Sequence, residues 1–336
     1  MKLPFEHIQA AHCENGVTTN LLRHIGIEQI SEPLAFGIGS GLFFIYLPFL
    51  KINHGPAFAF RTMPGMIFRR TCRALGIPVV RRKFRSPARA EAYLNECLQR
   101  GQPVGCQVGV YYLSYFPKAF RFHFNAHNLV VYGRDNGSYL ISDPVMEQPT
   151  SLSAYELQRV RFAKGPLAPR GQVYYPRPAG PLPPERIRQA IRKGIARNVR
   201  DMLYIPGPIA GVAGIAYTGK KIKKWRDKLG LKRAGLYLAQ LVRMQEEIGT
   251  GGGGFRFIYA AFLQQAHQYH PQDELLHISE QFTRAGDLWR SAAVQAAGIY
   301  KGRLSSQADF NQMGDYLLEI AQVEKQAFRA LAKVKW

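Results

Sequence analysis

The chain has 336 residues, enough for two domains, and its 46% hydrophobic and 12% aromatic content is typical of a globular protein with a large core. The formal net charge of +22 favours an acidic partner: nucleic acid, an anionic membrane surface or an acidic protein. No apolar run reaches the roughly 18 residues that span a membrane, and the four cysteines form neither a C-x-x-C pair nor a zinc cluster. We therefore expect reduced thiols in a cytoplasmic protein without a transmembrane segment.

The first predicted helix begins near Cys13. Apolar residues recur after it with helical spacing, at Val17, Leu21, Leu22 and Ile25. Backbone N–H groups and the helix dipole at a helix start favour a thiolate, and the same N–H groups can hold an oxyanion. Cys13 is therefore the predicted nucleophile, and the alternative is a buried, inert thiol.

Residues 34–50 are apolar and interrupted by glycines. Within this stretch we expect a loop at residues 36–42, in which Gly37, Gly39 and Gly41 let the backbone pass close to the active site. Gly39 is a candidate substrate-binding residue, and the alternative is a tight loop packed on the core. The G-x-G-x-x-G spacing of a dinucleotide-binding loop is absent.

Basic and aromatic residues are mixed over residues 55–85. Such mixing suits nucleic acid, through base stacking and phosphate contacts, but the segment carries no RNA-binding or helix-turn-helix motif. The spacing and the turn signals predict a helix at 69–75, a strand at 78–80, a helix at 86–100 and a strand at 104–112. Tyr112 and Tyr115 lie at the end of the last strand as candidate substrate-binding residues, and the alternative is a buried aromatic role.

Residues 127–143 predict a β-hairpin. One apolar run leads into Asn136–Gly137, the strongest short hairpin signal, and a second run returns. Antiparallel pairing then brings His127, at the start of one strand, beside Asp143, at the end of the other. Because an imidazole beside a carboxylate can act as a general base, His127 and Asp143 are the predicted catalytic partners of Cys13.

The segment 176–184 is rich in proline and predicts a stiff linker. We therefore expect a catalytic domain at 1–175 and a helical domain at 185–336. In the helical part the apolar spacing predicts helices at 185–203, 255–263, 273–285, 288–300 and 309–333.

The start of the helical part is strongly basic. Residues 185–243 contain fifteen Lys and Arg against three acidic residues, a net charge of +12. We expect this segment to dock an acidic protein. The alternatives are a solvated helix face and, around Trp225, a helix that lies on a membrane surface.

A glycine-rich run at 249–254 precedes the next apolar helix. Glycines before a helix can expose N–H groups to a phosphate or a carboxylate, and Arg256 adds positive charge, so Arg256 is a candidate substrate-binding residue. The Lys-Ser/Thr of an ATP-binding loop is missing. The alternative is a flexible joint between helices.

Several motifs together resemble the family named for butirosin biosynthesis protein H, the BtrH-like proteins. They are His12–Cys13–Glu14, Asn20–Leu21–Leu22–Arg23, residues 36–42, Tyr111–Tyr112–Leu113, residues 127–131, Ser142–Asp143–Pro144 and residues 249–256. The order of a cysteine, a distant histidine and an acid after the next strand is the papain-like order. We accordingly expect an α+β fold, with a papain-like N-terminal domain that combines a helix and an antiparallel sheet, followed by a mostly helical domain.

The resemblance implies an acyltransferase of secondary metabolite biosynthesis. Such an enzyme takes an acyl group from the phosphopantetheine thioester of an acyl carrier protein and passes it to an amine, forming an amide. Cys13 would carry the acyl group, His127 would move protons and Asp143 would orient His127. The Cys13 N–H and a side chain such as Gln9 would hold the oxyanion. No bound metal, nucleotide or redox cofactor is expected, and carrier proteins are usually acidic, which suits the basic segment.

Two other functions remain open at this point. A thioesterase or a peptidase would use the same three residues, with water in place of the amine. A non-enzymatic protein would use its basic helices to contact nucleic acid or a membrane.

Overall fold

A computed structural model describes residues 1–52, 55–247 and 249–336, which divide into two compact units. Unit 1 comprises residues 1–35 and 67–183, and unit 2 comprises residues 36–66 and 184–336. The chain passes from unit 1 to unit 2 at the end of the proline-rich segment expected as a linker. Residues 36–66, expected inside a catalytic domain at 1–175, instead pack within the helical unit.

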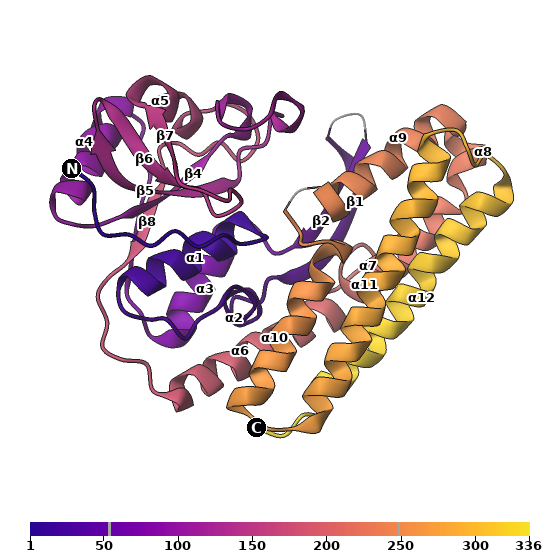
Figure 1. Ribbon diagram of the computed structural model, residues 1–336. Coiled ribbons are helices and arrows are strands. Elements are labelled where there is room, and N and C mark those ends of the chain that lie inside the picture. Colours follow the sequence, from indigo (N-terminus) through magenta and orange to yellow (C-terminus); the bar gives the residue numbers. More distant parts are fainter. Residues whose placement is uncertain (53–54, 248) are drawn as a thin grey trace. The chain divides into compact units, whose positions relative to one another are not determined.

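Unit 1 contains a six-stranded antiparallel sheet, labelled in Figure 1. Its strands in spatial order are β3 (Val79–Arg82), β8 (Val173–Pro176), β4 (Val104–Val108), β5 (His127–Asp135), β6 (Ser138–Ser142) and β7 (Thr150–Ser153). The helices of this unit are α1 (Cys13–His24), α3 (Met66–Leu75), α4 (Pro87–Gln99) and α5 (Ala154–Arg161), with short 3₁₀ turns η1 (Val110–Tyr112) and η2 (Lys118–Phe120). The fold class of the chain is therefore α+β, as predicted.

Local signals explain where several of these elements begin. The predicted hairpin is confirmed as β5 and β6, joined by a two-residue turn in which Asn136 (φ 45°) and Gly137 (φ 82°) are both left-handed. That pair of angles suits the right-handed twist of the flanking strands. Helix α4 begins after Ser86, whose hydroxyl accepts the Arg89 N–H, and Pro87 occupies its first turn.

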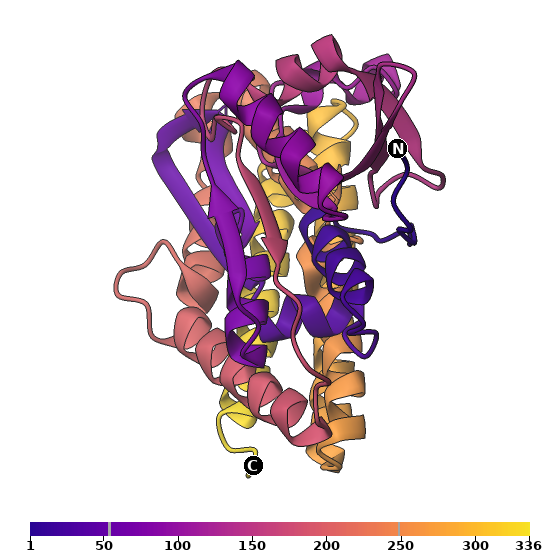
Figure 2. The same cartoon turned by 90° about the vertical axis from the view of Figure 1, so that its left-hand side faces the viewer.

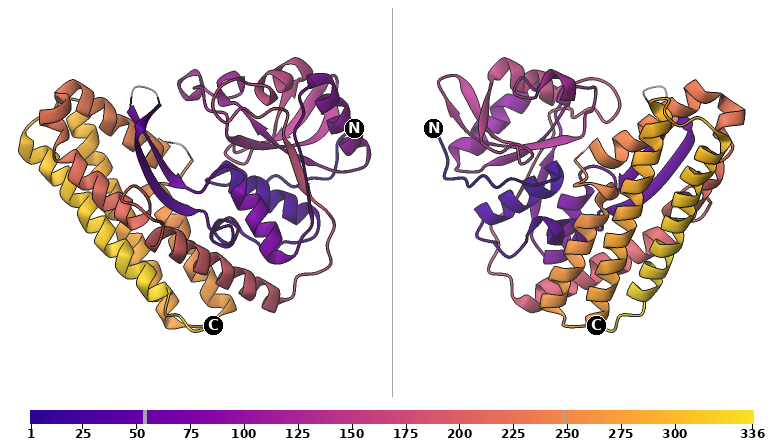
Figure 3. Two further views of the ribbon diagram at one scale, coloured as in Figure 1. Left: turned by 180° about the vertical axis from the view of Figure 1, so that it is seen from behind. Right: turned by 45° about the vertical axis from the view of Figure 1, so that its right-hand side comes forward.

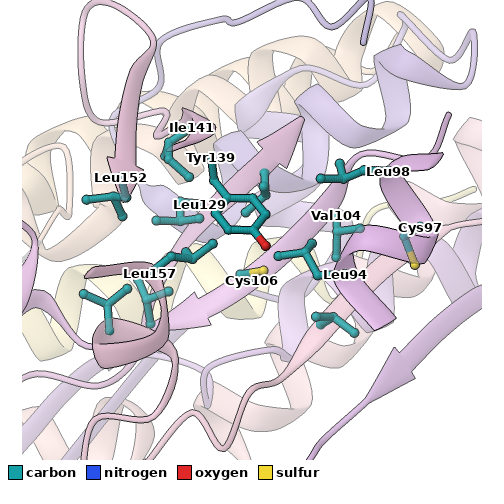
Figure 4. Packing of buried hydrophobic residues seen from close by; sticks show 14 of the residues in the cluster. Leu94, Cys97, Leu98, Val104, Cys106, Leu129, Tyr139, Ile141, Leu152 and Leu157 are labelled. Carbon is teal, nitrogen blue, oxygen red and sulfur yellow. The ribbon is translucent and has the colours of Figure 1, made fainter. Parts of the chain in front are cut away.

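Two faces of the sheet have different partners. Leu129 and Val131 of β5 belong to a buried cluster with Cys106 of β4 and with residues of α4 and α5. Figure 4 shows Leu129 and Cys106 in this cluster, with Leu94 of α4 and Leu157 of α5. Alternate residues of a strand point to opposite faces. Asn128 and Val130 therefore lie on the other face, and α1 packs against β4, β5 and β8 (Figure 1).

Unit 2 combines a β-hairpin with helices, and Figures 2 and 3 show the hairpin in violet beside them. Its strands are β1 (Leu42–Ile52) and β2 (Gly55–Arg61), preceded by α2 (Glu32–Ile38), which begins in unit 1 and ends in unit 2. The remaining elements are α6 (Pro184–Leu203), α7 (Gly211–Ile222), α8 (Trp225–Leu229), α9 (Leu231–Val242), the π-helical turn η3 (Arg243–Glu247), the 3₁₀ turn η4 (Gly253–Phe255), α10 (Arg256–Tyr269), α11 (Asp273–Tyr300) and α12 (Gln307–Leu331). Helices α10, α11 and α12 lie side by side (Figure 3).

The loop expected at 36–42 is shorter in the structure, because residues 36–38 end α2 and β1 begins at Leu42. Phe44 of β1 and Phe60 of β2 are buried against Trp289 of α11, with 5.0 Å between the Phe60 and Trp289 ring centroids. Aromatic burial of this kind contributes strongly to packing. It explains why residues 36–66 belong to unit 2.

The two helices expected at 273–285 and 288–300 are one continuous helix, α11. Gly286 lies in the gap between the two expected helices. Here, however, a Cβ on Gly286 would come within 2.7 Å of the Phe257 ring. The glycine therefore allows close packing of α11 on α10. In the part of the chain that the structure describes, no helix is both long and apolar enough to cross a membrane.

Candidate active site

Cys13 is the first residue of α1 and is 7% exposed. The preceding residue, His12, has an extended backbone, and its Nδ1 accepts the Asn15 N–H at 3.4 Å, which caps the helix. The thiol therefore lies at the positive end of the helix dipole, as predicted from the apolar spacing. Two further contacts fix the chain on either side of it.

The first contact joins α1 to the end of the hairpin. A Cβ on Gly16 would lie 2.4 Å from Pro144 and 2.7 Å from Ala10, so only glycine allows this close approach. The Ala10 N–H also donates to the Pro144 carbonyl at 2.7 Å. Pro144 follows Asp143 directly. The contact therefore holds the predicted acid near the start of α1.

The second contact is a carboxylate behind the helix start. Glu32 accepts the N–H groups of Ala11 at 2.9 Å and His12 at 2.8 Å. Burial raises the pKa of Glu32, and these hydrogen bonds oppose the rise. On α1 itself, buried Glu14 accepts the Ile67 N–H at 2.9 Å and the Phe68 N–H at 3.3 Å, which caps α3. The segment that carries Cys13 is thus fixed by backbone hydrogen bonds.

His127 and Asp143 lie together, as the hairpin predicted. His127 is the first residue of β5, and its Nε2 donates to Oδ2 of Asp143 over 2.6 Å. The side chains are almost completely buried, with 7% of His127 and none of Asp143 exposed. The other carboxylate oxygen of Asp143 accepts the Val145 N–H at 3.2 Å. The carboxylate is therefore held on both sides.

The second ring nitrogen of His127 faces the thiol. Since Nε2 binds Asp143, Nδ1 is left for the hydrogen bond that joins His127 to Cys13. Burial alone lowers the pKa of His127, but the charges of Asp143 and Cys13 and the hydrogen bonds to both outweigh burial and raise this pKa to about 10. The ring is therefore held as a cation at neutral pH, the form that accompanies a thiolate.

Tyr115 and Phe116 complete the surroundings of His127. The Tyr115 hydroxyl, expected as a substrate contact, donates to Oδ2 of Asp143 at 2.7 Å, on the same oxygen that binds His127. Burial, and then the negative charge of Asp143, hold the pKa of Tyr115 well above its ordinary value, so the hydroxyl keeps its proton. The Phe116 ring meets the His127 ring edge-on, 5.5 Å between centroids. Tyr115 therefore supports Asp143 from inside the unit.

The other expected substrate-binding residues have different surroundings. Tyr112 is half-buried in η1, and the Arg159 guanidinium lies 3.9 Å from its ring centroid. Gly39 lies in unit 2, in the turn between α2 and β1. The structure does not bring Gly39 or Arg256 into the unit that holds Cys13.

Arg256 is a correction to the expected site. Its side chain is completely buried, and Nε and Nη2 donate to the two carboxylate oxygens of Glu324 at 2.8 and 2.9 Å. Nη1 donates to the Gly254 carbonyl at 2.7 Å. The Gly253 N–H in the glycine-rich run donates to the Glu246 carboxylate at 3.1 Å, so this N–H is used within the chain. Arg256 is therefore a structural group of unit 2.

The four thiols differ in their surroundings. Cys72 in α3, Cys97 in α4 and Cys106 in β4 are completely buried and reduced, away from helix starts. Burial raises the pKa of Cys72 strongly, and it raises that of Cys106 to about 11. Among the described residues, no group of three or more His, Cys, Asp or Glu side chains is arranged to hold a metal ion.

One polar neighbour of Cys13 was missed from the sequence. Nδ2 of Asn128 lies 3.8 Å from the Cys13 sulfur, and its Oδ1 accepts the Tyr174 hydroxyl at 2.7 Å. The only sequence signal was its place directly after His127. Gln9, the side chain expected near the oxyanion, is exposed.

A buried thiol at a helix start, an imidazole on a strand and a carboxylate after the next strand define a papain-like α+β domain. Residues 12–144 match the family model described as butirosin biosynthesis protein H, N-terminal, and residues 155–331 match a domain of unknown function (DUF4872). The N-terminal domain belongs to the BtrH-like family, and a domain of the second family follows it. A search of curated proteins found no match.

Proposed function

We propose that the protein is an amide-forming acyltransferase of secondary metabolism, with Cys13 as nucleophile. The observation that carries the proposal is the His127–Asp143 pair, 2.6 Å apart, whose second ring nitrogen interacts with the thiol at the start of α1. The family is named for a protein of butirosin biosynthesis, which supports a biosynthetic enzyme. The donor substrate in this proposal is a phosphopantetheine thioester on an acyl carrier protein.

In the loading step, the Cys13 proton resides on Nδ1 of His127 and the thiolate attacks the thioester carbonyl carbon. A C–S bond to Cys13 forms, and the oxyanion accepts the Cys13 N–H, which makes no hydrogen bond within the described residues. The bond to the pantetheine sulfur then breaks, and His127 returns the proton to that leaving thiolate. Acyl-Cys13 and a free carrier thiol result. The two thioesters are close in energy, so this step is near balance.

In the transfer step, an amine attacks the acyl-Cys13 carbonyl and His127 takes the proton that the amine loses. The C–N bond forms, the C–S bond to Cys13 breaks, and the thiolate–imidazolium pair is restored. Asp143, held by Tyr115, keeps the His127 ring in the tautomer and orientation that both steps need. Amide formation is the favourable step that drives turnover.

For the carrier protein we propose a docking surface on the basic helices of unit 2. On α6, exposed Arg186, Arg192, Lys193 and Arg197 lie on the side away from the buried Ile187, Ile191 and Ile195. On α7, Lys220 and Lys221 are exposed at the C-terminal end. An acidic protein is attracted to such a face mainly through exposed charges.

The test is incubation of the full chain with an acyl carrier protein that carries an acyl thioester. Intact-mass spectrometry is expected to show the acyl mass on the wild type and on Cys72→Ala, but not on Cys13→Ala. A panel of amines is then added. The amide product supports acyl transfer, whereas release of only the free acid would identify a hydrolase and overturn the transferase proposal.

A further inference from the structure

The buried amide of Asn128 connects the thiol to a second element of the sheet. Its Nδ2 donates to the Ala126 carbonyl at 3.1 Å and to the Cys13 sulfur at 3.8 Å. Its Oδ1 accepts the Tyr174 hydroxyl from β8 at 2.7 Å. Asn128 and Tyr174 are both only 2% exposed.

These partners leave one orientation for the amide. If the amide were flipped, Oδ1 would face the Ala126 carbonyl, which is an acceptor, and Nδ2 would face the Tyr174 hydroxyl. Burial, and then the charges of Glu14 and Cys13, hold the pKa of Tyr174 well above its ordinary value, so this hydroxyl keeps its proton and donates. The N–H of Asn128 is therefore directed at the sulfur.

The fold makes room for this arrangement at Gly105. On β4, Gly105 lies between β8 and β5, paired with Tyr174 on one side and Val130 on the other. A Cβ on Gly105 would come within 2.6 Å of the Tyr174 ring. The missing side chain lets the tyrosine lie across the strand and reach Asn128, on the face of the sheet that α1 covers (Figure 1).

We propose that Asn128 is a hydrogen-bond donor to the Cys13 thiolate and that Tyr174 is the positioning residue that aims it. A donor beside an anionic sulfur favours the charged form, as does the start of α1. The sulfur then has His127 and Asn128 as partners from the same strand. This inference rests on the proposed role of Cys13 as nucleophile.

The test measures how fast iodoacetamide alkylates Cys13 in the full chain as a function of pH, with peptide mapping. Asn128→Leu removes the donor at similar volume and is expected to raise the midpoint of the pH profile by about one unit. Asn128→Asp places a carboxylate beside the sulfur and is expected to raise it further. Tyr174→Phe removes only the hydroxyl and is expected to shift it in the same direction by less.

A matched control is Asn125→Leu. Asn125 is another buried amide of unit 1, and its Nδ2 donates to the carbonyls of Lys164 and Pro166, not to the thiol. Its midpoint is expected to stay at the wild-type value. Titratable neighbours of Cys13 include His127, Tyr115 and Tyr174, and both tyrosines stay protonated over the assay range.

Unchanged midpoints in folded Asn128→Leu and Asn128→Asp would overturn the inference. If both variants unfold, Tyr174→Phe decides, because it keeps the ring that packs at 4.7 Å on Phe68. The assay contains no thioester. If the variants show the expected shifts of the midpoint but the wild type transfers no acyl group, the proposed function is refuted and the donor role of Asn128 stands.

Discussion

Each unit contains a buried ion pair. The two pairs differ in whether every nitrogen of the basic residue is bound by a carboxylate or a carbonyl oxygen of the core. In unit 2, three nitrogens of Arg256 bind Glu324 and Gly254, and the Trp289 N–H donates to the same carboxylate at 3.0 Å. In unit 1, Nε2 of His127 binds Asp143, and its other ring nitrogen interacts with the Cys13 thiol. A buried charge whose donors are matched within the core specifies packing. A buried histidine with a ring nitrogen beside a nucleophile can transfer a proton.

Burial by itself therefore does not distinguish a structural charge from a catalytic one. Both pairs are almost completely buried, and both basic residues were candidate site residues from the sequence. What distinguishes the two basic residues is the partner of the nitrogen that the carboxylate does not bind: a backbone carbonyl for Arg256 and a thiol for His127. The following predictions test whether that distinction separates chemistry in unit 1 from stability in unit 2.

The largest effect is expected at Cys13. Replacing it by alanine removes the nucleophile, so acyl transfer should fall by about 10⁴-fold or more, since groups that act as a unit show losses of this size. Iodoacetamide should also modify Cys13 faster than Cys72, Cys97 or Cys106 in the folded protein, because only Cys13 starts a helix. Faster labelling of one of the other three thiols would contradict the assignment.

In unit 2 the expected loss is in stability. Arg256→Met leaves Glu324 buried without its main partner and should lower the free energy of unfolding by about 3–5 kcal/mol, measured by urea denaturation. Arg284→Met, which breaks the exposed pair with Glu319, should cost less than about 1 kcal/mol. The kcat of folded Arg256→Met is expected to match the wild type, and a lower kcat would give Arg256 a part in the chemistry.

His127→Ala should lower kcat/KM by at least about a hundredfold, the usual scale for a general base. The control is His123→Ala, four residues earlier. His123 is exposed and stacks on the Tyr111 ring with 4.1 Å between centroids. Its loss should change the rate much less. Equal losses in the two variants would mean that proton transfer does not depend on the His127–Asp143 pair.

The raised pKa of His127 also predicts a pH dependence of stability. The pKa lies near 6.5 in the unfolded chain and at about 10 in the folded one, so the folded state binds the proton more tightly. This contribution is fully present below pH 6.5 and is lost as pH rises through about 10. Urea midpoints at pH 6, 8 and 10 should therefore fall more steeply for the wild type than for His127→Gln. Parallel profiles would show that His127 contributes no such linkage.

The smallest effect concerns the proposed docking surface. Reversing Lys220, Lys221 and Lys224 to Glu should raise KM for an acyl-carrier substrate about tenfold at low salt and leave turnover of a small thioester mimic unchanged. Lys223 stays unaltered, because it binds Asp315 within unit 2. The difference should shrink as salt rises, since exposed charges are screened over about 8–10 Å at 0.1–0.15 M.

Equal losses on both substrates would instead show that these lysines support the fold. If neither KM for the acyl-carrier substrate nor turnover of the mimic changes, these lysines do not form the docking surface. A surface cavity of about 220 Å³ in unit 1 is lined by Arg82, Arg100 and Arg177 and would be tested next.

Short-range signals in the sequence determined the hairpin, the start of α1 and the cap of α4. Each depends on a few neighbouring residues, such as Asn136–Gly137 at the turn or Ser86 before a helix. The hairpin predicted that the strand ends carrying His127 and Asp143 lie close together, and their side chains do meet, although the two residues are not register partners and a β-bulge between Val131 and Gly133 shifts the pairing. The helix start and the hairpin therefore sufficed to name the three proposed catalytic residues from the sequence.

Tertiary packing decided the rest. Tyr115 binds Asp143 and Tyr174 binds Asn128 across 28 and 46 positions of sequence, and Arg256 meets Glu324 across 68. The identity of an arginine or a tyrosine in the sequence does not show whether its side chain is buried in a core or contacts a ligand. Residues 36–66 likewise pack with helices that follow more than a hundred residues later. Which surfaces are buried together depends on the whole fold, and no local pattern of residues carries that information.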